Sequence, residues 1–98
     1  MIIELLKFQV SPSVQKKFID TDQKVWTTML EKFDGFIDKE VMINCHQKDE
    51  VICLIKWESR EKWKAIPLEI LQATDSQFAQ EMKNYPYKLV DSLEYYPI

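Results

Sequence analysis

Glycine is almost absent from this chain, since Gly35 is the only one among 98 residues. Phosphate-binding loops, dinucleotide-binding motifs and nucleophile elbows need glycines at fixed positions, because the backbone there approaches a ligand closely or takes unusual angles. A chain with a single glycine carries none of these motifs. The scarcity of glycine therefore excludes the usual sites for phosphate-bearing cofactors.

Histidine and cysteine are nearly as scarce. His46 is the only histidine, and Cys45 and Cys53 are the only cysteines. Zinc sites draw mainly on these two residue types, so no metal site is expected. Two cysteines so close in sequence form no disulfide framework, and reduced thiols are typical of cytosolic proteins. We therefore expect a cytoplasmic protein with no metal and no other cofactor.

Long apolar runs and basic clusters are also missing. Glu4 and Lys7 interrupt the apolar start MIIELLKFQV too early for a signal peptide or a membrane span. The formal net charge is −3, from 13 basic and 16 acidic residues, and no basic cluster exceeds a dipeptide. Because a phosphate backbone is bound by a dense basic face, neither a nucleic acid nor a membrane is an expected partner.

The residues that are present suit one soluble core. Hydrophobic residues make up 46% of the chain and charged residues 30%, which is ordinary for a globular protein. The length predicts a single domain over residues 1–98. Apolar patterning predicts four strands, at 2–10, 36–45, 51–58 and 87–96. It also predicts two helices between them, at 12–33 and 60–84.

Local signals mark the ends of the predicted helices. Ser11 and Pro12 begin the first helix, because a hydroxyl caps free amides and proline needs no N–H at this position. Gly35 ends it, since glycine takes the left-handed conformation without steric cost. Ser59 caps the second helix. Pro67 disfavours helical geometry at the residue before it, so a kink is expected there.

The predicted order is strand, helix, strand, strand, helix, strand. This order is typical of the α+β, ferredoxin-like βαββαβ fold, with a four-stranded antiparallel sheet and both helices on one face. Alternation within 36–45 puts Ile37 on one side with Val41, and Phe36 on the other with Met42. Apolar residues thus occur on both sides of the sheet, while two helices cover one. Because soluble monomers rarely expose a large apolar patch, we expect a homodimer that pairs sheet against sheet.

Asp22 is the most informative residue of the first helix. At about 100° per residue, the helix has an apolar arc of about 160°, and Asp22 falls near its centre. A buried carboxylate must be paired, hydrogen-bonded or neutral. Asp22 is therefore a candidate base beside a pocket, or alternatively a structural partner of a lysine or a backbone amide. The arc consists of Val14, Phe18, Ile19, Val25, Trp26, Met29, Leu30 and Phe33.

Aromatic residues surround this position in the predicted fold. Trp26 lies one helical turn beyond Asp22, and Phe18 lies one turn before it. Trp57 on a strand and Trp63 on the second helix could complete a flat slot for a planar ligand, or all three tryptophans could be core residues. Thr74 on the second helix could orient that ligand with its hydroxyl, or bond to a carbonyl one turn earlier.

Charged residues alternate with apolar ones along the predicted strands. Cross-strand salt bridges are their usual role, although they could also line a barrel or the mouth of a pocket. They are Glu4, Lys7, Lys39, Glu40 and Lys56.

The order of elements and several short motifs resemble the dimeric α/β-barrel superfamily, which includes antibiotic-biosynthesis monooxygenases. Within it, the chain looks closest to a small family of uncharacterised cyanobacterial proteins. The motifs are IIELLKF, DGF and WESREKWKAIP, and the matching residues are Glu4 with Lys7-Phe8, Asp22 with Trp26, Gly35-Phe36, Trp57-Glu58-Ser59 and Trp63-Lys64.

The resemblance implies a dimer with one cavity per subunit, in which a cofactor-independent monooxygenase or isomerase acts on a small aromatic or acidic organic molecule. Glu4 is the polar residue nearest to the family's strand-one position, which makes it a second candidate catalytic residue. Trp57 matches the strand-three tryptophan of the haem-degrading members, but the second helix has no histidine, so haem binding is disfavoured. The alternative is a non-catalytic module that binds small ligands or responds to stress.

Overall fold

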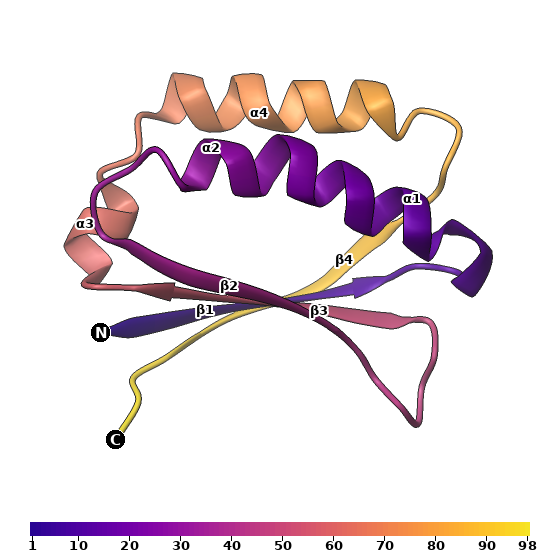
Figure 1. Ribbon diagram of the computed structural model, residues 1–98, viewed down its shortest axis with the longest axis horizontal. Helices are drawn as coiled ribbons and strands as arrows, with labels where there is room; N and C mark the ends of the chain where they lie inside the picture. Colours follow the sequence, from indigo (N-terminus) through magenta and orange to yellow (C-terminus); the bar gives the residue numbers. More distant parts are fainter.

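In the computed structural model, which describes residues 1–98, the helices form a layer over one face of a four-stranded sheet (Figure 1). The strands have nearly the predicted bounds and the predicted order along the chain, whereas the second helix ends at Glu81 instead of residue 84. The strands are β1 (Ile2–Gln9), β2 (Phe36–Ile43), β3 (Glu50–Trp57) and β4 (Lys88–Tyr95). The helices are α1 (Pro12–Asp22), η1 (Gln23–Thr27), α2 (Thr28–Leu30), α3 (Arg60–Lys64) and α4 (Leu68–Glu81).

The sheet has the order β2-β3-β1-β4, and all of its strand pairs are antiparallel. β1 lies in the interior, so its residues have a partner on each side: Glu4 lies opposite Ile55 of β3 and Glu94 of β4. This topology confirms the predicted ferredoxin-like βαββαβ fold with both helices on one face.

A bulge at the start of β2 corrects one part of the predicted pattern. The register shifts between Phe36 and Asp38, so that Phe36 pairs with Trp57. Phe36 then packs against Trp57 on the helix side of the sheet, with the two ring centroids 5.7 Å apart, while Ile37 is 44% exposed. Strict alternation predicted that Phe36 and Val41 lie on opposite faces of the sheet. This was wrong, because the extra residue of the bulge turns the side chain before it to the other face.

The first helix is continuous but not uniform. Its middle, η1, is a π-helical segment that follows Asp22 directly, and the helix ends at Leu30 instead of Phe33. Pro12 begins the helix as expected, but Ser11 makes no capping bond to the backbone. Gly35 takes a φ of 97° in the turn that follows, and a Cβ there would lie 2.6 Å from the Cβ of Lys62. Glycine is therefore required at this turn for two reasons, its conformation and its space.

The second helix is divided as predicted. α3 and α4 are separate, and Pro67 lies between them. The Ser59 hydroxyl accepts a hydrogen bond from the Lys62 backbone N–H at 3.1 Å, which is the capping bond expected from the sequence.

The core consists of two groups of buried side chains between helices and sheet, and Trp26 packs against both. One group contains Ile2, Met29, Leu30, Ile55, Trp57 and Ile66. The other contains Val10, Phe18, Val25, Val51, Phe78 and Met82. Members of both groups line the same cavity, so the space between the helix layer and the sheet is not completely filled by side chains.

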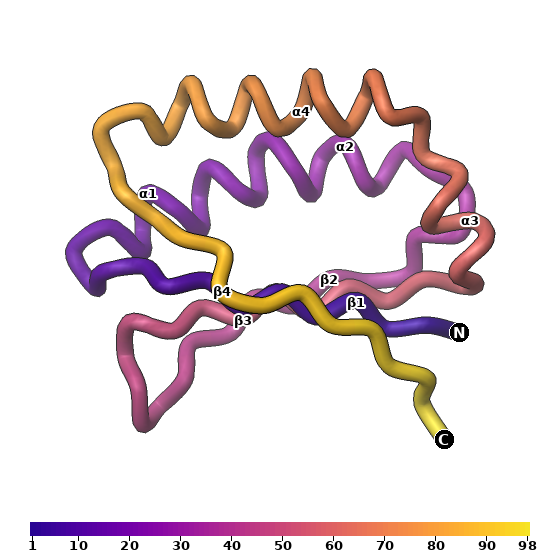
Figure 2. Tube along the Cα trace, turned by 180° about the vertical axis from the view of Figure 1, so that it is seen from behind, coloured from indigo at the N-terminus to yellow at the C-terminus, as the bar shows by residue number.

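The other face of the sheet has no helix over it (Figure 2). Leu5 and Leu54 pair across its centre, and Leu93 of β4 continues the row. Met42 is 40% exposed and Tyr95 49% exposed on the same face. No helix of the chain has the length and apolar character needed to cross a membrane.

Candidate functional site

A cavity of about 550 Å³ lies between the helix layer and the sheet. Hydrophobic side chains make up 13 of its 21 lining residues, and six of these are aromatic. The aromatic residues come from β1, α1, η1, α3, α4 and the segment before β4, and are Phe8, Phe18, Trp26, Trp63, Phe78 and Tyr87. A volume of this size is typical of sites for small organic molecules.

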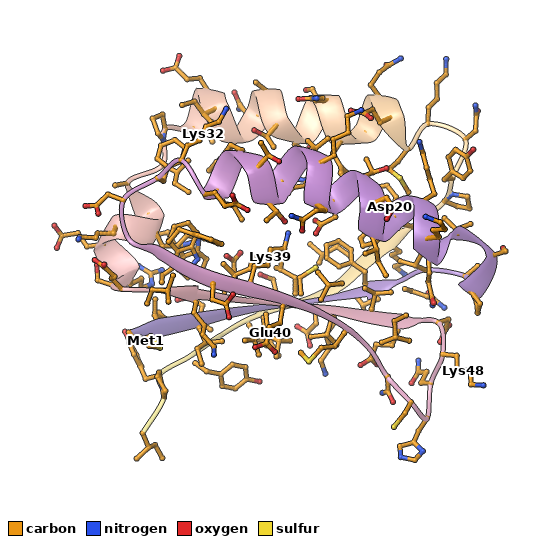
Figure 3. The ribbon with its side chains drawn as sticks, viewed as in Figure 1. Met1, Asp20, Lys32, Lys39, Glu40 and Lys48 are labelled. Atoms are coloured by element: carbon orange, nitrogen blue, oxygen red, sulfur yellow. The ribbon has the colours of Figure 1, made fainter.

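Asp22 faces this cavity and forms an ion pair with Lys39. The Lys39 Nζ donates to Asp22 Oδ2 at 2.6 Å, and the side chains are only 4% and 7% exposed, respectively. In Figure 3, Lys39 points from β2 toward the helix layer, while the adjacent Glu40 lies on the other side of the sheet. Asp22 therefore lies beside a pocket, as one interpretation expected, and pairs with a lysine, as the other did.

Glu4 also lines the cavity, from the helix side of β1. Its Oε1 accepts a hydrogen bond of 3.3 Å from the Trp57 indole N–H. Burial raises the pKa of the Glu4 carboxyl above its ordinary value, and the Trp57 hydrogen bond with the charges of Lys64 and Lys39 opposes this effect. A carboxyl with a raised pKa in an apolar cavity is suited to accept a proton.

Cys53 lies on the same wall, on β3, and is 1% exposed. Burial raises the pKa of its thiol to about 12, and the nearby Asp22 carboxylate adds to the effect. Because the thiolate is the reactive form, the Cys53 thiol is a packing group and not a nucleophile.

Two of the three tryptophans line the cavity. Trp26 and Trp63 contribute to its walls, whereas Trp57 is fully buried behind Glu4 and does not line it. Trp57 stacks on Trp63 with ring centroids 6.4 Å apart and an interplanar angle of 13°. Lys64 Nζ lies 3.9 Å from the centroid of the Trp63 ring. Trp57 thus supports the site through Glu4 and Trp63 without reaching a ligand.

Phe18 lines the cavity, and Thr74 does not. The Thr74 hydroxyl donates to the Ile70 carbonyl at 2.7 Å, which is the bond of a helical threonine to the preceding turn. The exposed His46 lies in the loop after β2, and its backbone N–H donates to Asn44 Oδ1. No histidine faces the cavity, and no group of three or more potential metal ligands occurs in the chain.

Several lining residues were not singled out from the sequence. Gln72 and Asp75 of α4 and Tyr87 contribute to the cavity. Lys39 was grouped only with the charged strand residues. Its position two residues before Val41, on the apolar side of the strand, was a signal that this lysine points inward and needs a partner.

Comparisons with known proteins agree with this architecture. The monooxygenase of Streptomyces coelicolor from the gene ActVA-Orf6, solved with nanaomycin D, has a TM-score of 0.74 at 14% identity, over 99% of this chain and 87% of its own. SnoaB, a cofactor-independent oxygenase from Streptomyces nogalater, has a TM-score of 0.62 at 11% identity, over 95% of this chain and 86% of its own. A conserved protein from Methanosarcina mazei has a TM-score of 0.65 at 15% identity, over 96% and 87%.

At these identities the similarity establishes the fold alone, and no curated protein matches the sequence. The family profile described as antibiotic biosynthesis monooxygenase, however, matches residues 1–66, which extend from β1 through α3 and so include both Glu4 and the Asp22–Lys39 pair. The chain belongs to the antibiotic biosynthesis monooxygenase family.

Proposed function

We propose that this protein is a cofactor-independent monooxygenase that acts on a small aromatic molecule held in the cavity. The observation that carries the proposal is the Glu4 carboxyl, which has a raised pKa and lies among aromatic walls. Membership of the family supports the class of reaction, as does the similarity in fold to SnoaB, which is a cofactor-independent oxygenase.

In this proposal Glu4, and not Asp22, is the base. The Asp22 carboxylate is engaged by Lys39 at 2.6 Å, whereas Glu4 accepts only one longer hydrogen bond of 3.3 Å. Asp22 instead holds the Lys39 ammonium beside the cavity. The remaining N–H groups of Lys39 can then stabilise an oxygen on which negative charge develops.

The proposed reaction begins when the Glu4 carboxylate takes a proton from an acidic CH₂ group of the substrate, such as the one that the keto tautomer of a phenol or naphthol carries beside its carbonyl. The resulting carbanion transfers its electron pair to dioxygen, and a C–O bond forms. The peroxide anion takes the proton back from Glu4. Loss of water across the C–H and O–O bonds then leaves a carbonyl at that carbon, so the substrate is oxidised and dioxygen is reduced to water and the carbonyl oxygen.

Two other functions use the same cavity. An isomerase would return the proton from Glu4 to a different carbon and consume no oxygen. A non-catalytic binding or stress-associated module would need only the aromatic walls, and the neutralisation of Asp22 by Lys39 supports this alternative.

The experiment that separates these functions is oxygen uptake with a panel of small phenols and naphthols, including 1,4-dihydroxynaphthalene. We expect uptake above the rate of spontaneous oxidation with the unmodified protein, and its loss in Glu4→Gln. Glu31→Gln is the matched control, because Glu31 is exposed and does not line the cavity. Proton exchange without oxygen uptake would indicate an isomerase, and binding without either would indicate a binding module.

The proposal also includes a homodimer in which two sheets face each other. The row of Leu5, Leu54 and Leu93 on the open face supports it, because two copies of one apolar surface can cover each other about a two-fold axis. A cytoplasmic location and the likeness to a cyanobacterial family stay predictions from the sequence.

A further inference from the structure

The charged residues around the cavity are unevenly balanced. Four acidic and two basic side chains line it. The acidic ones are Glu4, Asp22, Asp75 and Glu94, and the basic ones are Lys39 and Lys64. Substrate selection by charge depends on which of these are already neutralised by a partner and on how deeply the others lie.

Two of the acids are neutralised by close ion pairs. Asp22 is paired with Lys39 at 2.6 Å, and Glu94 is paired with Arg60 at 2.8 Å. Glu4 and Asp75 have no ion pair, and Lys64 is the one lining base that forms none. The cavity therefore has one more negative than positive charge outside its ion pairs.

The remaining charges also differ in depth. Lys64 is exposed and lies over the Trp63 ring at 3.9 Å, and Asp75 is exposed on α4. Glu4 is the most buried of the three, on an interior strand of the sheet. A ligand inside the cavity is screened by water from the two outer charges and much less from Glu4.

We infer that the cavity admits uncharged aromatic substrates and rejects anionic ones of the same shape. This inference rests on the proposed function and gives its substrate class. An uncharged substrate keeps the total charge constant when Glu4 takes its proton, because one negative charge moves from the carboxylate to the substrate. An anionic substrate would put two like charges in the cavity before the reaction and a dianion beside Glu4 after it.

The test compares three naphthalene probes of the same ring size by isothermal calorimetry near neutral pH. They are 2-naphthol, which is uncharged, 2-naphthoate, which is anionic, and 2-naphthylmethylammonium, which is cationic. We expect 2-naphthol to bind about ten-fold or more tightly than 2-naphthoate, as one unscreened like charge predicts. The ammonium probe should also bind more tightly than the carboxylate probe.

The ammonium probe separates the sign of the charge from the cost of removing any charge from water. Equal and weak binding of the two charged probes would overturn the attribution of this selectivity to negative charge in the cavity, and binding of 2-naphthoate as tight as that of 2-naphthol, or tighter, would overturn the inference itself. In either case the cavity would still be an aromatic site and the proposed function would stand. Failure of all three probes to bind would remove both the inference and the proposed function.

A pair of variants assigns the selectivity to Glu4. Glu4→Gln should reduce the difference between the ammonium and carboxylate probes several-fold, while Glu31→Gln, which changes the net charge equally at an exposed position, should leave it unchanged. An equal effect of both variants would overturn the assignment to a local charge. The comparison of probes on the unmodified protein tests the inference even if Glu4→Gln fails to fold.

Discussion

The ammonium of Lys39 donates to the carboxylate of Asp22 at 2.6 Å, and this pair joins β2 to the end of α1 across the wall of the cavity. Both side chains are buried, so each charge would be costly without the other. The π-helical segment η1 begins directly after Asp22. Segments of this kind interrupt the regular helix and often occur at functional sites, so the pair and the helix irregularity together define one side of the site.

The first prediction concerns the stability of this pair. Asp22→Leu leaves the Lys39 ammonium buried without a partner, and Lys39→Met does the same to Asp22. Each single variant should lower the free energy of unfolding by about 3–5 kcal/mol, whereas the double variant should recover most of that loss. Urea unfolding of the four proteins measures the coupling.

A lysine elsewhere provides the control for this cycle. Lys16 pairs with Asp20 at 2.7 Å, but that pair is exposed. Lys16→Met should therefore change the stability little. If Asp22→Leu alone proved as stable as the unmodified protein, the structural importance of the buried pair would be refuted.

The second prediction follows from the raised pKa of Glu4. In the folded protein the carboxyl has a higher pKa than in the unfolded chain, so the folded state binds more protons between the two values. The free energy of unfolding then falls as the pH rises through this window. Glu4→Gln removes this cost and keeps an acceptor for Trp57, so it should raise the melting temperature at neutral pH by a few degrees.

The stabilisation by Glu4→Gln should disappear at about pH 4 and below, where the carboxyl is protonated in both states. Thermal unfolding followed by circular dichroism at several pH values measures this. Glu31→Gln should show no such pH-dependent gain. A lower melting temperature of Glu4→Gln at neutral pH would contradict the assignment of the raised pKa to burial.

The third prediction concerns the two thiols. Cys45 is exposed, whereas Cys53 is buried with a pKa of about 12. A disulfide reagent should therefore modify one thiol per chain in the native protein and both after denaturation. Cys45→Ser should abolish the native reaction. A Cys45→Ser protein that still reacted rapidly would mean that Cys53 is accessible through the cavity.

The fourth prediction tests the proposed dimer. Leu54 lies at the centre of the open face, between β1 and β2. Leu54→Lys should convert the dimer to monomers, because the substitution places like charges against each other about the two-fold axis. Analytical ultracentrifugation measures the masses. Leu68→Lys is the control, since Leu68 is 67% exposed on the helix layer. A monomeric unmodified protein at micromolar concentration would refute the dimer.

The order of the elements, the kink at Pro67 and the turn at Gly35 could be predicted from local sequence patterns. These features depend on backbone preferences and on apolar periodicity within a few neighbouring residues, and both can be read directly from the amino-acid sequence. The place of Asp22 on an apolar helix face was predictable for the same reason. The uncovered second face of the sheet followed from counting the apolar residues on each strand.

The contacts of the polar residues of the site depend on tertiary packing and could not be predicted in this way. Asp22 and Lys39 are 17 residues apart, and Glu4 and Trp57 are 53 apart, so no local pattern indicates either pair. The bulge after Phe36 changes the side on which that residue faces, and the π-helical segment changes the helical phase after Asp22. One inserted residue in a strand or helix changes the direction of the neighbouring side chains. The roles of Glu4 and Asp22 depend instead on long-range partners, which only the packing of the whole domain brings together.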